Sequence, residues 1–311
     1  MSRKNRLKAE LDRKLNKAGG AHLTKESGRR FSRCFTRLMR TLGFTHLLEP
    51  EQIMVKHIVA YVEARKEEGI ATRTLQNEVA HLRKILRLSN RSQLADSSDI
   101  SNAALGLSGA SRKGTKQPMT GERLLELQIL ARQQDRPGMA ALLGLEYHLG
   151  LRGAEAIHAC TDTLMRWRQE LSASSSIRVL AGTKGGRPRD VLILRPLAAA
   201  WAIFAALEVC QSQGGFLVVR KDGSPAGGLK QARSIYHAWA HRAGIEPHAA
   251  RYAFAANQME EYLRRGYSER EALIAISHAL GHGDGRGRWV RSVYLQTPGT
   301  PRSTPADEVR A

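Results

Sequence analysis

Apolar residues in the first hundred positions recur at the spacing of an α-helix. Phe31, Phe35 and Leu38 fall on one face of a predicted helix that Gly43 can end, while arginines occupy the other faces. The same spacing returns over residues 58 to 64 and after Thr72. Since no alternation of apolar and polar residues typical of a strand appears before residue 100, the pattern predicts a helical domain over residues 23–102.

A short basic segment precedes this domain. Residues 3 to 17 contain seven basic and two acidic side chains, and Leu7, Leu11 and Leu15 lie four positions apart. This pattern is typical of a solvated basic helix and equally of an arm that contacts DNA. We therefore expect a basic amino-terminal arm over residues 1–22.

The remaining two thirds of the chain mix helical and strand patterns. Residues 103–119 are small, polar and basic with little periodicity, which predicts a linker. Helices are predicted over Gly121–Gln133, Met139–Leu149, Leu197–Val209, Leu229–Ala243 and Arg251–Arg264. Apolar runs at Ile177–Leu180 and Val191–Leu194 flank a glycine-rich basic turn and predict a β-hairpin. The expected fold is mainly α with a small antiparallel β-sheet, with a second domain over residues 120–296 and a disordered tail over residues 297–311.

The charge of the chain favours a polyanionic partner. Its 49 Lys and Arg residues exceed its 29 Asp and Glu residues by 20, which creates a positive field that attracts nucleic acid. A membrane surface is the weaker alternative, because the longest apolar run, residues 197 to 207, has 11 residues and a bilayer span needs about 20. The amino terminus shows no apolar segment of the signal-peptide type, and Cys34, Cys160 and Cys210 lack metal-ligand spacing, so a cytoplasmic location is expected.

The second half of the chain is suited to one of the two ways in which proteins cleave a phosphodiester. This group repels anionic nucleophiles, so its cleavage needs either metal ions on clustered carboxylates or a fixed set of cations and hydrogen-bond donors. Residues 120–311 hold no Asp-x-Asp and no His-Glu-x-x-His pattern. His278 and His282 lie four positions apart without a third ligand of matching context, so no metal or other cofactor is predicted. The candidates for the cation set and its phenol are Arg152, Lys184, His248, Arg251, His282 and Tyr294.

The order and local context of these six residues resemble the tyrosine recombinases, the phage-integrase family. Its motifs are matched here by Gly150-Leu151-Arg152 with Glu155, by Lys184 in the hairpin turn, by His248 with Arg251, by Leu280-Gly281-His282, and by Tyr294 in last place. Each short motif is weak by itself, but six matches in family order are specific. Residues 69–87 also resemble the helical core-binding domain of these enzymes. The resemblance implies a core-binding domain over residues 23–102 and a mixed α/β catalytic domain over residues 120–296.

The resemblance also implies a role for each candidate residue. Arg152 and Arg251 would bind the non-bridging phosphate oxygens through their planar guanidinium groups. His248 and His282 would donate to the phosphate or move protons, with His248 accepting the tyrosine proton. Lys184 would protonate the departing 5′ oxygen.

The implied protein is a site-specific DNA recombinase that integrates or excises a mobile element. Tyr294 would become linked to the 3′ phosphate, and a different 5′ hydroxyl would then reverse the step without ATP or metal. The implied partners are double-stranded DNA with a specific recombination site and three further copies of the chain in a homotetramer. Accessory DNA-bending proteins are further candidate partners.

Two departures from the family pattern concern the nucleophile. Tyr252 follows Arg251 where the family commonly has histidine, and the segment between His282 and Tyr294 is longer than usual. Two alternatives to a recombinase stay open. One is a DNA-binding regulator of this family without chemistry, and the other is a type IB topoisomerase.

Basic residues outside the six are candidate contacts to the DNA backbone. They are Arg29, Arg33, Arg37 and Arg40 in the first domain, Arg112, Lys113 and Lys116 in the linker, and Arg187, Arg189, Arg286 and Arg288 in the second domain. The alternative for each is an exposed charge that contacts only solvent. Phosphate contacts carry no sequence information, so the DNA sequence that is bound does not follow from them.

Overall fold

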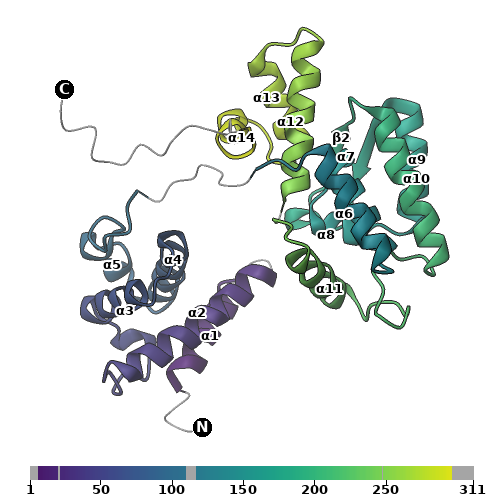
Figure 1. Ribbon diagram of the computed structural model, residues 1–311. Coiled ribbons are helices and arrows are strands. Elements are labelled where there is room, and N and C mark those ends of the chain that lie inside the picture. Colours follow the sequence, from purple (N-terminus) through teal and green to yellow (C-terminus); the bar gives the residue numbers. More distant parts are fainter. Residues whose placement is uncertain (1–5, 20–21, 110–116, 247, 296–311) are drawn as a thin grey trace. The chain divides into compact units, whose positions relative to one another are not determined.

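The computed structural model describes residues 6–19, 22–109, 117–246 and 248–295, and the chain forms two compact units, Met1–Ser111 and Arg112–Ala311 (Figure 1). Helices make up most of both units, and unit 2 holds a two-stranded antiparallel sheet. The predicted fold class is therefore confirmed.

Unit 1 consists of helices and turns, with no strand in its described residues. The helices are α1 (Arg6–Lys17), α2 (His22–Thr41), α3 (Val55–Glu67), α4 (Thr72–Leu88) and α5 (Ser92–Ala95). Phe31 and Phe35 lie in the core as their spacing predicts, and the Tyr61 ring packs 5.1 Å from that of Phe35. The Tyr61 hydroxyl donates to Glu78 at 2.9 Å, and Arg65 pairs with the same carboxylate at 2.7 Å. The buried Glu78 carboxylate therefore has both a hydrogen-bond donor and an ion-pair partner.

Helix α1 packs into unit 1 and is not a separate arm. Leu7, Leu11 and Leu15 are all buried in the core of the unit. A Cβ on Gly28 of α2 would come within 3.1 Å of the Leu15 side chain, so the two helices lie close together. The predicted arm over residues 1–22 is therefore wrong for α1. The leucine spacing makes α1 amphipathic whether the helix is free or packed, so the spacing alone does not reveal whether another surface covers the leucines.

The predicted linker over residues 103–119 begins too early. Leu105 and Leu107 are buried in the core of unit 1, and the Gln76 amide donates to the Leu107 carbonyl at 2.6 Å. This part of the segment therefore belongs to unit 1. The basic residues Arg112, Lys113 and Lys116 lie outside the described residues, as does the predicted tail over residues 297–311.

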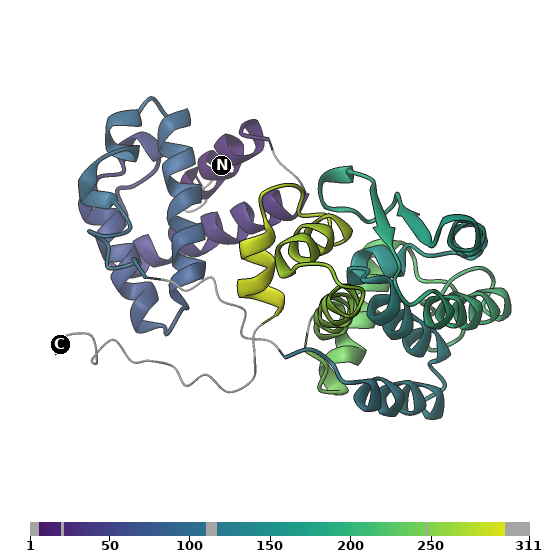
Figure 2. The ribbon, with the colours of Figure 1, turned by 90° about the horizontal axis from the view of Figure 1, so that it is seen from above.

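Unit 2 is arranged around α7 (Figure 2). Its helices are α6 (Gly121–Gln133), α7 (Pro137–Leu149), α8 (Gly153–Ile157), α9 (Thr161–Ser174), α10 (Pro196–Ser212), α11 (Leu229–Arg242), α12 (Ala249–Arg264), α13 (Glu269–Ala279) and α14 (Gly287–Tyr294). Helix α7 is apolar on most faces, which fits its central place among α6, α8, α10 and α12. It starts at Pro137 and ends at Gly150, whose φ of 61° is left-handed. A Cβ on Gly150 would lie 2.4 Å from the Phe254 ring, so only glycine fits there.

The five helices predicted for unit 2 are all present, with ends that differ by at most a few residues. Helix α9 was not predicted, although Leu164, Trp167 and Leu171 follow helical spacing and are buried. The Trp167 indole N–H donates to the Arg178 carbonyl at 2.9 Å and so joins α9 to the sheet. No helix in the described part of the chain is long and apolar enough to cross a membrane.

The predicted hairpin is present and reaches the start of α8. Strand β1 (Ser176–Val179) pairs antiparallel with β2 (Arg189–Leu192), with Ile177 opposite Val191. In the turn, Gly182 has a φ of 72°, and a Cβ there would lie 2.6 Å from the Ala154 carbonyl oxygen. This close approach holds the hairpin turn against α8, next to Arg152 and Glu155.

Candidate active site

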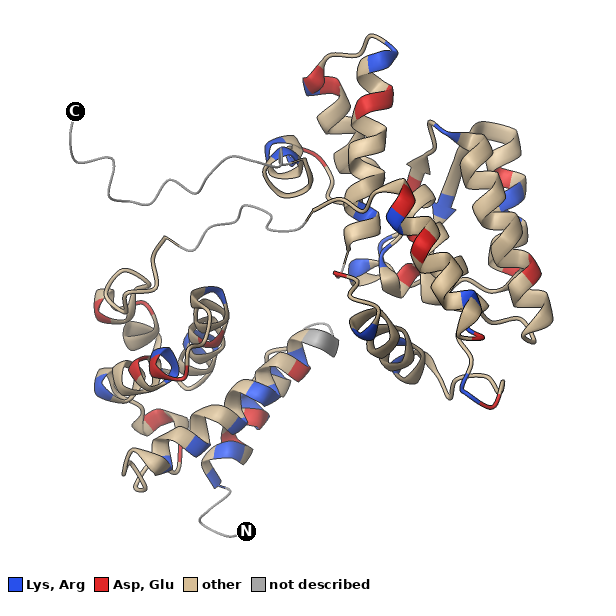
Figure 3. Ribbon diagram, viewed as in Figure 1, with Lys and Arg blue, Asp and Glu red and all other residues tan. Residues whose placement is uncertain are grey.

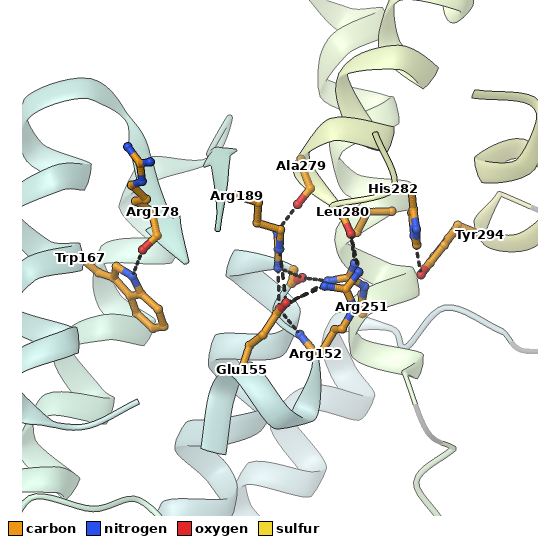
Figure 4. A network of polar contacts seen from close by, with 11 residues as sticks. Arg152, Glu155, Trp167, Arg178, Arg189, Arg251, Ala279, Leu280, His282 and Tyr294 are labelled. Carbon is orange, nitrogen blue, oxygen red and sulfur yellow. Dashed lines mark hydrogen bonds and ion pairs between the residues drawn. The ribbon is translucent and has the colours of Figure 1, made fainter. Parts of the chain in front are cut away.

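The Glu155 carboxylate holds two guanidinium groups side by side (Figure 4). Glu155 is buried on α8 and accepts hydrogen bonds at 2.6 Å from both Arg152 and Arg189. Arg251 pairs with the same carboxylate at 3.9 Å. Burial by itself would raise the pKa of Glu155, but the charge and hydrogen bond of Arg189 and the charge of Arg251 hold that pKa below its ordinary value. Glu155 is therefore the anionic centre of a cluster of three arginines.

Two backbone carbonyl oxygens complete this arginine cluster. The Leu280 carbonyl accepts from Arg152 Nη2 at 2.9 Å and also from Arg251 Nη2. The Gly150 carbonyl accepts from Arg251 Nη1 and, at 3.2 Å, from Arg189 Nη2. Arg152 and Arg251 thus converge on one point, although they come from the start of α8 and from α12.

Gly281 permits the close approach of the chain to these arginines. It has a φ of 65°, which places it in the left-handed region, and a Cβ there would lie 2.7 Å from Arg189 Cδ and 3.6 Å from Arg152 Nη1. The Leu-Gly-His motif therefore has a physical basis. Glycine in its middle lets the Leu280 carbonyl reach the cluster, and the chain then continues directly to His282.

The arginine cluster carries excess positive charge. Three guanidinium groups surround the Glu155 carboxylate, which leaves a formal charge of +2 from these four residues. Arg251 is 1% exposed, and burial followed by the charge of Arg189 lowers its pKa to about 10. Arg251 is still charged at neutral pH, and it lacks compensation by water. A group with negative charge, such as a phosphate, would stabilise such a cluster.

Tyr294 lies beside His282 and among other aromatic rings. It is the last residue of α14 and is 7% exposed, and its hydroxyl oxygen is 3.3 Å from His282 Nε2. The Tyr252 ring centroid is 4.5 Å from that of Tyr294, and the Trp289 ring meets the His282 ring edge-on at 4.3 Å. These contacts fix the phenol next to the arginine cluster, as Figure 4 shows.

The connection ahead of α14 is anchored to α13. The Ser277 hydroxyl donates to the Gly283 carbonyl at 2.9 Å, and His278 pairs with Asp284 at 2.7 Å. The segment that is longer than usual for the family therefore forms a turn with defined contacts. Among the described residues there is no group of three or more His, Cys, Asp or Glu side chains that could hold a metal ion.

His282 is a neutral imidazole at physiological pH. Burial, followed by the charges of Arg251, Arg152 and Lys184, lowers the pKa of His282 to about 3. A neutral ring can accept a hydrogen bond from the Tyr294 hydroxyl through Nε2. The residue that the structure puts beside the phenol is thus His282, whereas the sequence favoured His248 as the acceptor of its proton.

The other two predicted residues have different degrees of contact with the cluster. Lys184 is exposed in the hairpin turn, within a 3-10 turn over Lys184–Gly186, and its charge acts on His282. His248 is exposed and precedes α12 with a left-handed φ of 71°. Arg152, Arg251, His282 and Tyr294 are therefore brought together directly, and Lys184 is brought within electrostatic range.

Arg189 differs from the other predicted DNA contacts because it is buried. It is 8% exposed, and it donates to Glu155, to the Gly150 carbonyl and to the Ala279 carbonyl. Its interpretation as an exposed charge is therefore wrong, because its guanidinium group is bonded within the protein, and its contact with the DNA backbone stays a prediction. The strand alternation gave a signal for this, because Arg189 shares the inward face of β2 with Val191. Trp289, by contrast, gave no signal in the sequence.

The remaining predicted cations within the described residues are exposed. In unit 1 they lie along α2, where Lys and Arg recur on the ribbon (Figure 3), and they are Arg29, Arg33, Arg37 and Arg40. Arg37 also pairs with Glu68 at 3.0 Å. In unit 2 they are Arg187, Arg286 and Arg288.

A mainly helical unit with a positively charged arginine cluster beside a buried tyrosine defines a class of protein that has the groups needed to hold a phosphate next to a phenol. Comparison with known families agrees with this description. Residues 4–95 match the family described as phage integrase, N-terminal, and residues 106–257 match the family described as integrase. The chain belongs to the phage-integrase family, the tyrosine recombinases, which confirms the resemblance found in the motifs.

Solved structures of integrases share this fold. The Tn1549 transposon integrase in complex with a circular intermediate DNA aligns with a TM-score of 0.59 at 13% identity, over 92% of this chain and 95% of that chain. A lambda integrase tetramer bound to a Holliday junction aligns with a TM-score of 0.58 at 15% identity, over 94% of this chain and 79% of that chain. Among proteins with curated functions, none matches this chain in sequence.

Proposed function

We propose that the protein is a site-specific DNA recombinase that cleaves and rejoins strands through a 3′-phosphotyrosine at Tyr294. The observation that carries this proposal is the shared Leu280 carbonyl, to which Arg152 and Arg251 both donate two residues before the histidine that contacts the Tyr294 hydroxyl. A phosphate bound by both guanidinium groups would therefore lie close to the phenol. No carboxylate cluster for metal ions accompanies these groups in the described residues.

In the proposed reaction, the Tyr294 oxygen attacks the scissile phosphorus and the bond from phosphorus to the 5′ oxygen breaks. Arg152 and Arg251 stabilise the negative charge that develops on the non-bridging oxygens. Lys184, on the exposed hairpin turn, delivers a proton to the departing 5′ oxygen. The phosphotyrosine conserves the bond energy, so that a 5′ hydroxyl of another strand can reverse the step.

The proton of Tyr294 passes to histidine in this proposal. His282 is the neutral ring 3.3 Å from the hydroxyl, but with a pKa of about 3 it is a weak base in the DNA-free protein. A bound phosphate would offset the arginine charges that lower this pKa and would so raise the basicity of the ring. His248, exposed at the start of α12, then serves as a donor to the phosphate or as an alternative acceptor.

The proposed substrate is double-stranded DNA that carries a recombination site of a mobile element. The net charge of +20 and the exposed arginines of α2 supply contacts to the DNA backbone. The similar integrase structures were solved with DNA, and one of them is a tetramer. We infer a homotetramer on two synapsed duplexes for this chain as well, with DNA-bending proteins as candidate accessories.

The test uses nicked duplexes made from the DNA that flanks the gene on both sides. A nick near the crossover lets the short fragment that carries the released 5′ hydroxyl leave, so that a covalent protein–DNA adduct accumulates. We expect an adduct with the wild type and none with Tyr294→Phe, while Tyr252→Phe, which alters the neighbouring ring, keeps it. An adduct that persists in Tyr294→Phe overturns the assigned nucleophile.

Two further outcomes separate the alternative functions. DNA retention without an adduct under any condition would indicate a binding module without chemistry. Recombination between two plasmid-borne sites, with no relaxation of an unrelated plasmid, excludes a type IB topoisomerase. Relaxation of any supercoiled plasmid would favour the topoisomerase.

A further inference from the structure

A second buried acid, Glu146 on α7, lies under the arginine cluster and has no part in the reaction described above. It is 5% exposed, and its Oε1 atom receives no hydrogen bond from any residue within the described ranges. A Cβ on Gly153 would stand 3.3 Å from this oxygen and also 3.3 Å from Tyr236 Cε1 of α11. Glu146 is therefore packed between α11 and the residue that directly follows Arg152.

The surroundings of Glu146 suit a neutral carboxyl better than a carboxylate. An ionised carboxylate in a buried site needs several donors, whereas here one oxygen has none and the Tyr236 hydroxyl is the neighbouring donor. The charged groups that face it are Arg251 on α12, which favours the anion, and Glu155 on α8, which opposes it. Burial outweighs the others and raises the pKa of Glu146 to about 7.

We propose that Glu146 is a positioning residue whose proton keeps the arginine cluster ready for a phosphate; this role rests on the function proposed above. With the proton in place, the cluster has the charge of three guanidinium groups against the single carboxylate of Glu155. Without the proton, Glu146 adds a second negative charge that attracts Arg251 and reduces the positive charge available to the DNA. Protonated Glu146 therefore favours cleavage, and ionised Glu146 opposes it.

The direction of the pH dependence follows from this role. A phosphate bound at Arg251 is a further negative charge near Glu146, so DNA binding favours the protonated carboxyl and takes up a proton above pH 7. If cleavage needs protonated Glu146, the rate of cleavage is highest below the pKa of Glu146 and falls as the pH rises through that pKa. For a single proton, the protonated fraction one pH unit above the pKa is about one tenth.

The first measurement concerns the proton itself and needs no DNA. Carboxyl ¹³C spectra of protein labelled at glutamate are recorded from pH 4 to pH 9, and the Glu146 signal is assigned by its loss in Glu146→Gln. We expect it to titrate near pH 7, and at a higher pH in Tyr236→Phe, because the hydroxyl that favours the anion is gone. A titration at about 4.3, the usual pKa of glutamate, overturns the proposal.

The second measurement is the rate of adduct formation on the nicked duplexes at pH 6 and pH 8. At DNA concentrations below saturation, where the pKa of the DNA-free protein governs the rate, the ratio of the Glu146→Gln rate to the wild-type rate is expected to rise from about one to about ten, because glutamine stays neutral at both pH values. Equal rates at pH 6 show that the variant is folded, and Glu126→Gln, which changes an exposed acid on α6, should follow the wild type. Tyr236→Phe should move the loss of rate to higher pH.

The experiment distinguishes a failure of the role proposed for Glu146 from a failure of the proposed recombinase function. If the wild type forms an adduct and its pH profile is the same as that of Glu146→Gln, the role assigned to Glu146 is overturned and the proposed recombinase function stands. Absence of any adduct from the wild type overturns the proposed function instead.

Discussion

Replacing Glu155 by glutamine should destabilise unit 2 far more than replacing an exposed acid. The carboxylate accepts charge-assisted hydrogen bonds at 2.6 Å from two arginines and lies 3.9 Å from a third. Glutamine keeps one acceptor oxygen, but it turns the other position into an amide donor that faces a guanidinium group. Removing one partner of a buried ion pair costs about 3–5 kcal/mol.

Tryptophan fluorescence during urea unfolding measures this loss for unit 2 alone, because all four tryptophans lie there: Trp167, Trp201, Trp239 and Trp289. With a urea dependence of about 2 kcal/mol per molar, the expected loss moves the midpoint down by about 2 M. The control is Glu126→Gln, whose pair with Arg123 is exposed and contributes about 0–1 kcal/mol. The reasoning is refuted if both variants unfold at the same urea concentration.

Four further changes test other parts of the structure. Arg152→Lys should lower the rate of adduct formation by about 10²–10³, because lysine cannot bond Glu155 and the Leu280 carbonyl together; a rate within a factor of three would contradict this. Gly281→Ala should reduce both the urea midpoint and the adduct, whereas Gly283→Ala, with a similar φ but no neighbour within 4 Å, should cost only the backbone strain. Leu11→Ala should destabilise unit 1 by about 2–5 kcal/mol in hydrogen exchange, and an effect near zero would restore the free arm. His282 stays neutral when folded, since its pKa is lowered to about 3, but becomes charged when unfolded; unit 2 should therefore lose stability as the pH falls from about 6.5 towards 3, and His282→Asn should lose less.

Helical periodicity and motif order predicted much of the fold and the centre of the candidate site. The spacing of Phe31 and Phe35 depends on local geometry alone, so it could be read from sequence. The same holds for Gly150 and for the order of Arg152, Arg251 and Tyr294, which the structure brings into one cluster.

The errors share a different cause, because each depends on contacts between distant segments. The leucines of α1 look the same on a free helix as on one packed against α2. Arginine is usually a surface residue, and Arg189 is buried where it donates hydrogen bonds to Glu155 and to two carbonyls from other segments. The low pKa of His282 likewise results from burial and from charges that lie between 30 and 130 positions away in the chain.

The three residues from Leu280 to His282 connect the position of the arginine side chains with the position of the Tyr294 phenol. The oxygen of the first anchors the guanidinium groups, and the ring of the third meets the phenol. Because Gly281 alone separates the two, a shift of this tripeptide would move the proposed phosphate-binding guanidinium groups and the partner of the proposed nucleophile together. A mutation here that improves one of the two is expected to disturb the other, so this stretch is a poor place to alter the proposed activity and a good one to abolish it.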